Sequence, residues 1–545
     1  MSNDDNDEKV ARNLAQQADI AELARSLRSG TMTRREFNRR LAALGIGAAL
    51  AGTLAASPRA ARATPKRGGR VRAAAGEHGP SDTLDPAKMV AIIDYCRGEQ
   101  FYNGLTRING ALQAEPELAE SWEPDAGGTQ WVFRLRRGVE FHDGRSFGAE
   151  DVRYSLERHL DPKVGSVAKG FIENVEKIVV EDGHTVRFRL KGPDADFPVV
   201  LGLFQMKIVP NGYTDFATAI GTGPFKVAEF KPGIRSLGVR NSSYWDEGKP
   251  YVDEVEWFGI GDNLARLNAL LAGDIHMMTG LDPKAIPRLA STSGVKAVNT
   301  KAGQFVDFAM MTDRAPTDND DFRLAIKHLF DREAILKRIY EGNGMVGNDQ
   351  PISPVDPMHC PTLPARPLDL DRARHLLKKA GMEGASVKLH TAEVAGTGAI
   401  EQALVLQSQA ARIGLKIEIQ RDPNDGYWSA TWGKQPFFMS GWNMRPTANI
   451  MLTLAFQSSA TINEAKWKNA RFDELLIQGR SELDETRRRE IYCEAQRLIS
   501  DTGGVAIPCY FDYVDAMSER VQGFEPVPLG PLAAGQWPKF VWLDA

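Results

Sequence analysis

The chain is poor in cysteine, and none of its cysteines is spaced for a metal or redox site. The four cysteines among its 545 residues, Cys96, Cys360, Cys493 and Cys509, lie far apart. The sequence has neither a C-x-x-C pair nor an H-E-x-x-H motif, the patterns that hold zinc. We therefore expect no cofactor and no metal held by protein side chains, although a metal chelate could still be a ligand. The cysteines fit either two disulfides or four free thiols.

The chain also lacks an excess of basic charge and a long apolar run. Its 67 Lys and Arg residues are balanced by 71 Asp and Glu residues, which gives a formal net charge of -4. No basic patch is expected to attract a phosphate backbone, so we expect no nucleic-acid partner. The apolar run "LAALGIGAALAGTLAA" (Leu41–Ala56) is too short and too rich in Gly and Ala to span a membrane stably.

That short run has the features of a cleavable export signal. It follows the basic stretch "TRREFNRR" and precedes a small-x-small end, Ala61-Arg62-Ala63. The pair Arg34-Arg35 resembles the twin-arginine signal of bacteria. We predict that residues 1–63 are a signal peptide with a long n-region, read by the twin-arginine translocase, and that the mature chain starts near Thr64 in the periplasm. No cysteine near the cleavage point offers a lipid attachment site. The alternative is a buried N-terminal helix that follows arginines by chance.

The rest of the chain has the pattern of a large α/β protein with more than one domain. Alternating apolar and polar residues predict strands in "QWVFRLRRGVEF" and "TVRFRL", with a helix over Ala149–His159 between them. Two helices in series are predicted in "DFRLAIKHLFDREAILKRIYEG", one in "DLDRARHLLKKAGM" and two in "FDELLIQGRSELDETRRREIYCEAQRLISDTGG". A Pro-rich stretch over Pro351–Pro367 predicts a long connection.

The stretch "FHDGRSFGAEDVRYSLERH" contains a G-x-S-x-G match, the pattern of a hydrolase nucleophile elbow centred on Ser146. A true elbow places its serine directly between strand and helix, whereas here a His-Asp-Gly-Arg turn intervenes. Glu150 and Asp151 also have a structural role, because acidic residues are favoured in the first turn of a helix. From the residues alone, an exported α/β hydrolase that uses Ser146 is the alternative function.

The stretch "PELAESWEPDAGGTQWVFRLRRGVEFHDGRSFGAEDVRYSLERHLDP" resembles the signature region of the family 5 extracellular solute-binding proteins. Further landmarks of that family recur in order: "LDPAKMVAIIDYCRGEQFYNGL", "GTGPFKVAEFKPG", "NSSYWDEGKPYVDEVEW", "LNALLAGDIHMM", "DFRLAIKHLFDREAIL" and "FDELLIQGR". These are the dipeptide, oligopeptide and nickel-chelate receptors of ATP-binding-cassette importers. The resemblance implies that the region around Ser146 is structural and that the chain is a receptor with no catalytic residue.

The resemblance implies a two-lobed α/β fold of the type II periplasmic binding protein kind, with an extra subdomain inserted in lobe one. Mapped by the landmarks, lobe one comprises residues 64–106, 221–300 and 510–545, the inserted subdomain residues 107–220, and lobe two residues 301–509. A peptide or peptide-like small solute is expected between the lobes. Hinge closure would then present the receptor to the inner-membrane permease of the importer.

The ligand question depends on the stretch "FMSGWNMRPTANIMLTL". In peptide-binding relatives the matching loop carries an aspartate for the peptide's ammonium group, whereas residues 443–447 contain no carboxylate. Dipeptide receptors also supply an arginine near the segment that matches "HTAEVAGTGAIEQ", which contains none. Both departures argue against a free dipeptide, because each buried ligand charge would lack a partner. Longer peptides and non-peptide solutes remain open.

Trp442 and Arg445 are the leading ligand-binding candidates in this loop. An indole face offers apolar and cation–π surface, and a guanidinium binds a carboxylate or phosphate in bidentate fashion. The alternative is that Trp442 packs within a lobe and Arg445 is a solvated charge. Asn443 and Thr447 of the same loop are further candidates.

Two other segments supply weaker candidates. Tyr427 and Trp428 follow an Asp-Pro-Asn-Asp-Gly turn and could line the cleft, although packing in the core is equally expected. Met89, Val90 and Asp94 match the lobe-one loop that contacts ligand in relatives. An apolar loop of this kind is also expected in a core.

Overall fold

The computed structural model describes residues 64–544, so the predicted signal peptide lies outside the described residues. Residues 65–545 form a unit of their own. Within the described part of the chain, no helix combines the length and apolar character needed to cross a membrane.

One mixed sheet of twelve strands runs through this unit. In spatial order its main path is β15 (Lys416–Arg421), β14 (Ser386–Thr391), β16 (Phe437–Trp442), β12 (Val295–Met310), β18 (Cys509–Ser518), β11 (Met277–Met278), β1 (Arg70–Ala75), β10 (Glu254–Gly259), β9 (Arg235–Arg240) and β8 (Phe225–Lys231). Two short strands lie off this path: β13 (Gly344–Val346) pairs with β18, and β17 (Val505–Ala506) pairs with β12.

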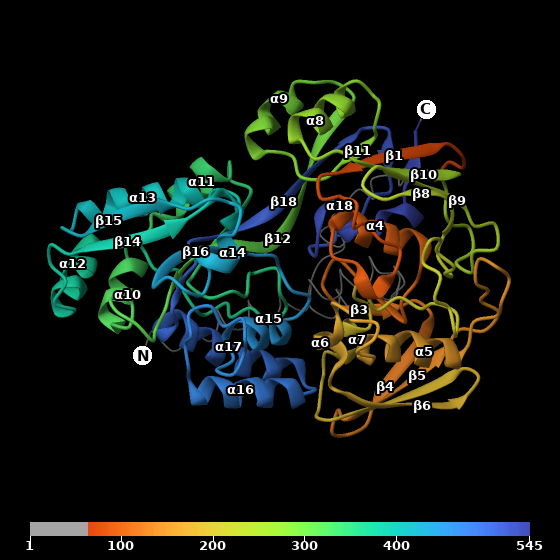
Figure 1. Ribbon diagram of the computed structural model, residues 1–545, viewed down its shortest axis with the longest axis horizontal. Helices are drawn as coiled ribbons and strands as arrows, with labels where there is room; N and C mark the ends of the chain where they lie inside the picture. The colour runs from red at the N-terminus through yellow and green to blue at the C-terminus, as the bar shows by residue number, and fades with distance from the viewer. Residues whose placement is uncertain (1–63, 545) are drawn as a thin grey trace, which may run out of the picture. The chain divides into compact units, whose positions relative to one another are not determined.

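Strands β12 and β18 connect the two halves of the sheet. The first part of β12 pairs with β18 from Val295↔Ser518 to Thr300↔Tyr513, and the register then shifts between Thr300 and Gln304. Beyond that irregularity β12 pairs with β16, from Phe305↔Trp442 to Met310↔Phe437. Figure 1 shows β12 and β18 side by side between the two groups of elements. The two halves therefore share a pair of long strands.

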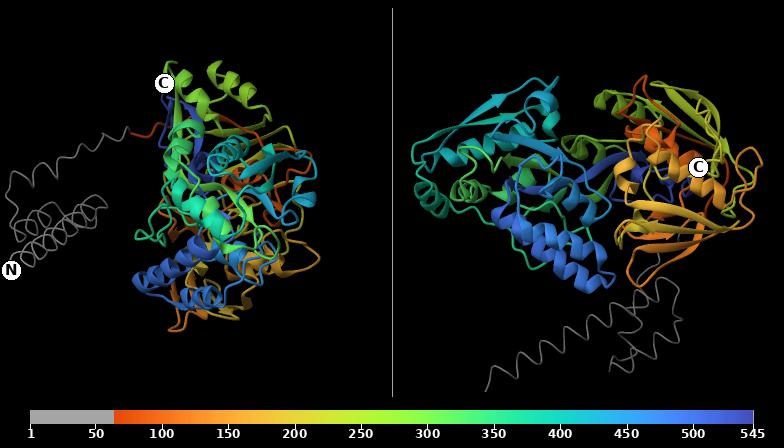
Figure 2. Two further views of the ribbon diagram at one scale, coloured as in Figure 1. Left: turned by 90° about the vertical axis from the view of Figure 1, so that its left-hand side faces the viewer. Right: turned by 60° about the horizontal axis from the view of Figure 1, so that its bottom comes forward.

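Helices cover both halves, and their first turns are capped as the sequence indicates. The half with β1 carries α4 (Ile92–Phe101), α8 (Asn263–Leu271), α9 (Ile286–Ala290) and α18 (Pro531–Ala534), with short 3-10 turns η1 (Pro86–Lys88), η2 (Pro283–Ala285) and η4 (Trp537–Lys539). The other half carries α10 (Asp320–Lys327), α11 (Arg332–Ile339), α12 (Leu370–Lys379), η3 (Glu393–Ala395), α13 (Ala399–Ala411), α14 (Tyr427–Ala430), α15 (Ala448–Phe456), α16 (Ala470–Ser481) and α17 (Glu485–Thr502). Asn319, Asp331, Asp369, Asn469 and Asp484 each accept a backbone N–H at a helix start. Figure 2 shows the two groups from further directions.

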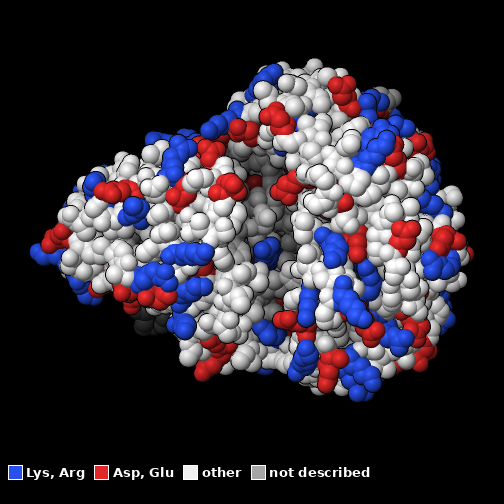
Figure 3. Space-filling view, in the orientation of Figure 1, with Lys and Arg blue, Asp and Glu red and all other residues white. Residues whose placement is uncertain are grey.

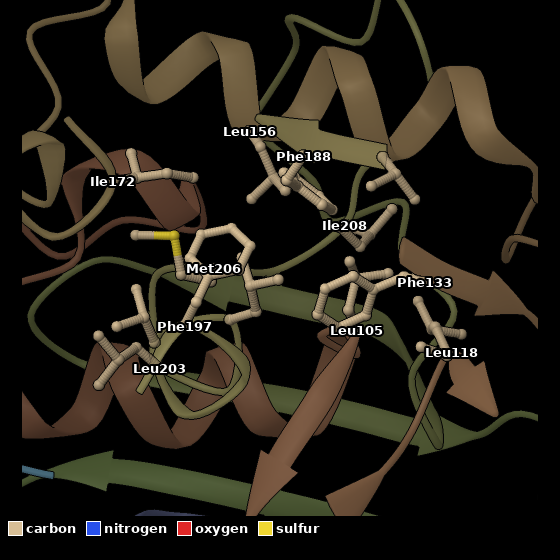
Figure 4. Close-up of a cluster of buried hydrophobic side chains, with 14 of the residues drawn as sticks. Leu105, Leu118, Phe133, Leu156, Ile172, Phe188, Phe197, Leu203, Met206 and Ile208 are labelled. Atoms are coloured by element: carbon tan, nitrogen blue, oxygen red, sulfur yellow. The ribbon is translucent and has the colours of Figure 1, made fainter. Parts of the chain in front are cut away.

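A separate four-stranded sheet lies within the predicted inserted subdomain. Its order is β4 (Ala119–Pro124), β5 (Gln130–Leu135), β7 (Thr185–Leu190) and β6 (Val175–Asp182). The hairpin β2 (Thr106–Ile108) and β3 (Ala114–Pro116), with α5 (Ala149–Leu160), α6 (Lys169–Ile172) and α7 (Phe197–Val200), completes this region, and a two-stranded pair β19 (Val521–Gln522) and β20 (Trp542–Leu543) lies near the C-terminus. Figure 4 shows the apolar core of the region, in which Phe133, Phe188 and Phe197 pack edge to face.

The helices and strands predicted from periodicity are confirmed. Alternation in "QWVFRL" and "TVRFRL" corresponds to β5 and β7, whose apolar positions are buried while the polar positions between them are more exposed. The helix expected over Ala149–His159 is α5, and the five further helices are α10, α11, α12, α16 and α17. The helix boundaries differ by a few residues at most, because a cap or a turn fixes them rather than periodicity. Strand β5 ends at Leu135, well before the end of the stretch that predicted it.

Candidate functional site

A cavity of about 280 Å³ has walls from both halves of the sheet. On one side lie Glu77 after β1 and the start of α4, together with residues 203–205 of the inserted region. On the other side lie residues 443–446 after β16, and Tyr513 of the shared strand β18 contributes as well. Figure 3 shows the surface hollowed between the two groups of elements, with basic and acidic side chains on its walls. The cavity is therefore a cleft at the junction of the halves, where binding sites are preferentially found.

The loop after β16 is placed in the cleft by the elements on both sides of it. Strand β16 ends at Trp442, and helix α15 begins after Thr447, whose side chain accepts a hydrogen bond from the backbone N–H of Ile450 at 3.2 Å. Four residues are left between strand and cap, and all four line the cavity. A short segment between two rigid elements gives a loop side chain a fixed position, as binding requires.

Arg445 is a half-buried cation without an anionic partner among the described residues. Its Nε is buried and has no hydrogen-bond partner there. The guanidinium lies 5.8 Å from the centre of the Trp442 ring, and the phenol groups of Tyr513 and Tyr95 lie near enough to influence it. Burial lowers the pKa of Arg445, yet an arginine stays charged at neutral pH. A carboxylate or phosphate in the cavity would supply the missing acceptor.

Trp442 is held from behind by a buried pair of carboxyl groups. Its indole N–H donates to Glu464 Oε1 at 2.8 Å, and the indole of Trp432 donates to Glu464 Oε2 at 2.6 Å. The carboxyl group of Asp307, on β12, contacts that of Glu464 and has no other hydrogen-bond partner among the described residues. Burial raises the pKa of both carboxyl groups, and the neighbouring Glu464 raises that of Asp307 further. The pair therefore holds its protons to a higher pH than free carboxyl groups do, and Glu464 fixes the indole behind Arg445.

A second cavity of about 290 Å³ adjoins the first. Both are lined by Glu77, Ile92, Asn443, Tyr513 and Pro531. Three carboxylate residues, Glu77, Asp512 and Asp515, line the second cavity, and none of its lining residues is basic. We call this second cavity the acidic chamber.

The structure brings three of the nine predicted ligand-binding residues to the first cavity. Val90 from the lobe-one loop lines it together with Asn443 and Arg445 from the loop after β16. Val90 is 59% exposed, as single apolar residues on a protein surface often are. These three come from segments about 350 residues apart in the chain, and only the fold brings them together.

The other predicted residues from the cleft loops have structural contacts. Thr447 caps α15, and Trp442 stands beside the cavity on Glu464 rather than among its lining residues. Met89 is fully buried in the core of the β1 half. Asp94 is buried, accepts the backbone N–H of Thr83 at 3.1 Å and pairs with Arg97 at 3.2 Å.

The aromatic pair on α14 also lies outside the lining of the first cavity. Tyr427 is buried, and its hydroxyl donates to the backbone oxygen of Met439 at 2.7 Å. Trp428 is 44% exposed and packs edge to face on Tyr427. Tyr427 therefore packs in the core, which was the alternative expected from the sequence.

Glu77, Tyr95 and Tyr513 also line the first cavity, although they were not predicted from the sequence. Tyr95 lies three residues after Ile92 in α4, so it shares the cavity-facing side of the helix with that residue. Glu77 is a charged residue that follows a mostly buried strand, and this change from apolar to charged residues could have been used to predict its position at the cavity. Tyr513 has no local signal, because its position depends on the pairing of β18 with β12.

Ser146 lies in a surface hairpin and not on a nucleophile elbow. It is exposed and forms an isolated antiparallel bridge with Glu140. The neighbouring His142 directs Nε2 to the backbone oxygen of Gly223 at 3.0 Å, so its ring is held by the backbone and not by a serine. Asp151 accepts the backbone N–H of Gly148 at 2.8 Å and caps α5. The G-x-S-x-G match is therefore a turn followed by a helix start.

The cysteines differ from both arrangements that the sequence suggested. Cys360 and Cys493 form one disulfide across 133 residues of sequence, and Cys96 and Cys509 are free and buried. The expectation of two disulfides or none was wrong, because burial in separate cores keeps the other two thiols from each other. Within residues 64–544 no cluster of three His, Cys, Asp or Glu side chains is arranged to hold a metal ion.

Comparison with known proteins relates this architecture to a family. The model of bacterial extracellular solute-binding proteins, family 5 Middle, matches residues 113–464. Heme-binding protein A of Haemophilus influenzae is 26% identical over 488 residues, covering 82% of this chain and 88% of that protein. Di/tripeptide-binding protein 2 of Pseudomonas aeruginosa is 27% identical over 493 residues, covering 82% and 91%.

Solved structures agree with the fold. The periplasmic binding protein DppA from Helicobacter pylori, in complex with the peptide STSA, superimposes with a TM-score of 0.73 at 25% identity and covers 88% of this chain and 99% of its own. HbpA2 from Haemophilus parasuis gives a TM-score of 0.78 at 22% identity, with coverages of 88% and 100%. The predicted two-lobed α/β fold is thereby confirmed. The family model matches more than half of this chain. The chain therefore belongs to the bacterial extracellular solute-binding proteins of family 5, a family of binding proteins rather than of enzymes.

Proposed function

We propose that this protein is a periplasmic receptor that encloses a peptide or peptide-like small solute between its lobes and delivers it to the permease of an ATP-binding-cassette importer. The observation that carries the proposal is the unpaired Arg445 in a cavity with walls from both halves. A half-buried cation whose buried Nε has no partner is costly, so a bound solute with an anionic or strongly accepting group would stabilise the closed form. Relatives named for dipeptides, tripeptides and glutathione support a peptide-like solute.

The proposal includes export by the twin-arginine translocase and residence in the periplasm. The basis is the sequence signal in residues 1–63, with its Arg34-Arg35 pair. The disulfide between Cys360 and Cys493 supports an oxidising compartment, because such bonds persist mainly outside the cytosol.

The lobe limits also belong to the proposal. Lobe one would comprise residues 64–106, 221–300 and 510–545, with residues 107–220 inserted, and lobe two residues 301–509. The limit at residues 300 and 301 falls at the irregularity of β12, and the limit at 509 and 510 falls at the start of β18. Hinges are commonly found at such positions, where a few residues change their backbone angles.

Native mass spectrometry of the purified protein tests the proposal. The protein would be measured directly after purification and again after incubation with a mixed peptide digest. We expect a mass excess over the chain that disappears on denaturation. Arg445→Ala should lose the excess, while Arg374→Ala, which removes an exposed arginine paired with Asp371 on α12, should keep it. The mass of the chain alone under both conditions would contradict the proposal.

A further inference from the structure

A larger cavity lies between the inserted region and the helices that follow the loop after β16. Its volume is about 640 Å³, whereas that of the first cavity is about 280 Å³. One wall consists of residues between 167 and 200, and the other consists of residues between 449 and 480. We call it the side cavity. Small-molecule sites usually measure about 300–1,000 Å³, so the side cavity is of ordinary size and the first cavity alone is small.

The side cavity adjoins the first cavity. Val167 and Phe171 of the inserted region line both cavities. On the facing wall, Met444 lines the first cavity and Ile450 lines the side cavity, and both pack against the apolar core of the inserted region. A solute whose anionic group meets Arg445 can therefore continue past Val167 into the side cavity.

Apolar side chains that are not fully covered gather around the side cavity. They are Val167, Phe171, Ile450, Leu454 and Ile462. Val167 is 53% exposed, and the other four are half-buried. One exposed apolar side chain is ordinary on a protein surface, but five around one cavity form a contiguous apolar surface, which marks a place where a ligand or partner binds.

Polar side chains in the walls of the side cavity bond to the protein itself. Arg480 donates to Asn449 Oδ1 at 3.4 Å and to Thr453 Oγ1 at 3.1 Å. Lys191 Nζ donates to the backbone oxygen of Glu173 at 2.6 Å. Among residues 64–544, none that lines the side cavity has a buried side-chain nitrogen or oxygen without a hydrogen-bond partner. An apolar occupant would therefore leave no polar group of these walls unsatisfied.

The walls of the side cavity come from opposite halves and meet at one place. Asp194 of the inserted region and Arg480 of α16 both line the cavity. The backbone N–H of Ala195 donates to the backbone oxygen of Arg480 at 3.0 Å, and the Asp194 carboxylate accepts the backbone N–H of Asp196 at 3.0 Å. The cavity is thus bounded on both sides only when the halves are close. An apolar group inside it would be removed from water and would favour the closed form.

We infer that the solute carries a bulky, uncharged and largely apolar part, which passes Val167 and Phe171 and fills the side cavity while the anionic group of the solute binds Arg445. This inference rests on the proposed function and specifies its substrate class. The solute is then a peptide with large apolar side chains or an acylated peptide, rather than a small polar one. Both kinds of apolar group offer the side cavity the same chemistry.

The test uses three pools of solutes that all have a free C-terminal carboxylate. They are tetrapeptides of Gly, Ala and Ser, tetrapeptides of Leu, Val and Phe, and N-octanoyl dipeptides of Gly, Ala and Ser. Equilibrium dialysis against a series of concentrations of the purified protein measures the affinity for each pool. We expect at least one of the two apolar pools to bind at least about ten-fold more tightly than the first pool, because burial of one large apolar side chain contributes at least the 1.4 kcal/mol that a ten-fold change requires.

Two substitutions of Leu454 locate the apolar part of the solute. Leu454→Trp fills the side cavity, and Leu454→Asn makes its wall polar at nearly the same side-chain volume. Both variants should lose most of the preference for the apolar pools. The same two changes at Leu404 should keep it, because Leu404 is 52% exposed on α13 and does not line either cavity. Thermal unfolding shows which variants are folded, and Leu454→Asn keeps the test decisive if the larger Trp side chain is not accommodated.

The outcomes separate the inference from the function on which it rests. If the three pools bind with equal affinity, the inference is wrong and the receptor function stands. If the preference for an apolar pool is undiminished in a folded Leu454 variant, the apolar part is bound elsewhere and the inference is wrong. A preference for only one of the two apolar pools, lost in the Leu454 variants, supports the inference and tells side chains from an acyl chain. If no pool binds, the proposed receptor for peptide-like solutes fails, and the inference fails with it.

Discussion

Substitution of Arg445 is the most direct residue-level test of solute binding. Arg445→Ala should weaken solute binding by about 2–5 kcal/mol, the usual cost of truncating one partner of a buried charge pair. Arg445→Lys should recover only part of this loss, because a point charge cannot replace a planar guanidinium. The solute-free protein should not lose stability, since Arg445 forms no ion pair there. Calorimetry with the solute found by mass spectrometry measures the first effect and thermal unfolding the second.

Equal affinities of Arg445→Ala and the parent would show that Arg445 is a surface charge without a role in binding. An equal loss of affinity in Arg374→Ala would point to a general effect of surface charge. In that case high salt would abolish the difference in affinity between each variant and the parent.

The buried pair of Asp307 and Glu464 predicts a pH dependence of stability. Both groups have a raised pKa in the folded protein, so folding retains a proton that the unfolded chain releases above about pH 4. Stability contributed by this pair is therefore full at low pH and is lost as pH rises toward the folded pKa. Asp307→Asn removes one titrating group and should flatten the decline, by at most about 1.4 kcal/mol per pH unit.

Urea unfolding of Asp307→Asn and of the parent, at a series of pH values from 5 to 9, measures this difference. Asp371→Asn is the control, because that carboxylate is 95% exposed. Parallel curves for Asp307→Asn and the parent would mean that the pair holds no proton. The fluorescence of Trp442 and Trp432 should respond over the same pH range, since both indoles donate to Glu464.

At the scale of elements, the long connection over Pro351–Pro367 is fixed to α17. The disulfide between Cys360 and Cys493 closes a loop of 133 residues. Next to it, Gln496 accepts the backbone N–H of Cys360 at 2.9 Å and donates to the backbone oxygen of Met358 at 2.7 Å. A segment without regular structure thus gains a position on a long helix.

Replacing both cysteines by serine should destabilise the protein by about 2–5 kcal/mol, because the unfolded chain regains the entropy that the closed loop removed. The parent should become as unstable as the variant in a strong reductant, and the variant should not respond to the reductant. Urea midpoints with and without reductant give both comparisons. A parent that is indifferent to reductant would exclude a stabilising disulfide.

The elements themselves were largely predictable from the sequence, and the site was predictable only in part. Strands β5 and β7 and helices such as α5 and α12 carry their own periodicity and caps, so local signals suffice. The cleft loop after β16 was predicted through a family resemblance. Which side chains face the cavity was not predictable, because adjacent residues such as Met89 and Val90 differ only in direction.

The acidic chamber shows why the rest needed the fold. Glu77 and Asp512 are separated by more than 400 residues, and no local pattern relates them. Both line this cavity because β1 and β18 each pair with β11, on opposite sides of it. Partnerless polar atoms such as Nε of Arg445 are likewise visible only after packing is known.

At the scale of the whole molecule, export is the first step that can be tested. Replacing Arg34 and Arg35 by lysine should leave full-length precursor in the cytoplasm, because the twin-arginine translocase reads the arginine pair. Immunoblots of cytoplasmic and periplasmic fractions measure the precursor and the mature chain. An unchanged periplasmic yield would show that the chain leaves by another route or that the pair is not a signal.

Closure of the lobes is the motion on which the receptor function depends. Besides the hinge strands, the inserted region contacts α16 and α17 of the other half: Asp196 pairs with Arg488 at 2.9 Å, and the backbone N–H of Ala195 donates to the oxygen of Arg480 at 3.0 Å. Contacts of this kind form only when the halves are close together. A solute that binds both halves would therefore shift the population toward the closed form.

Small-angle X-ray scattering with and without saturating solute is the most direct test of the central claim that this protein encloses a solute between two lobes. The account predicts a smaller radius of gyration in the presence of the solute, because the lobes meet and water leaves the cleft. Arg445→Ala, at a solute concentration that saturates the parent but not the variant, should show a smaller change. A radius of gyration that is the same with and without bound solute would contradict the account, because the solute would then occupy a rigid site or one outside the cleft.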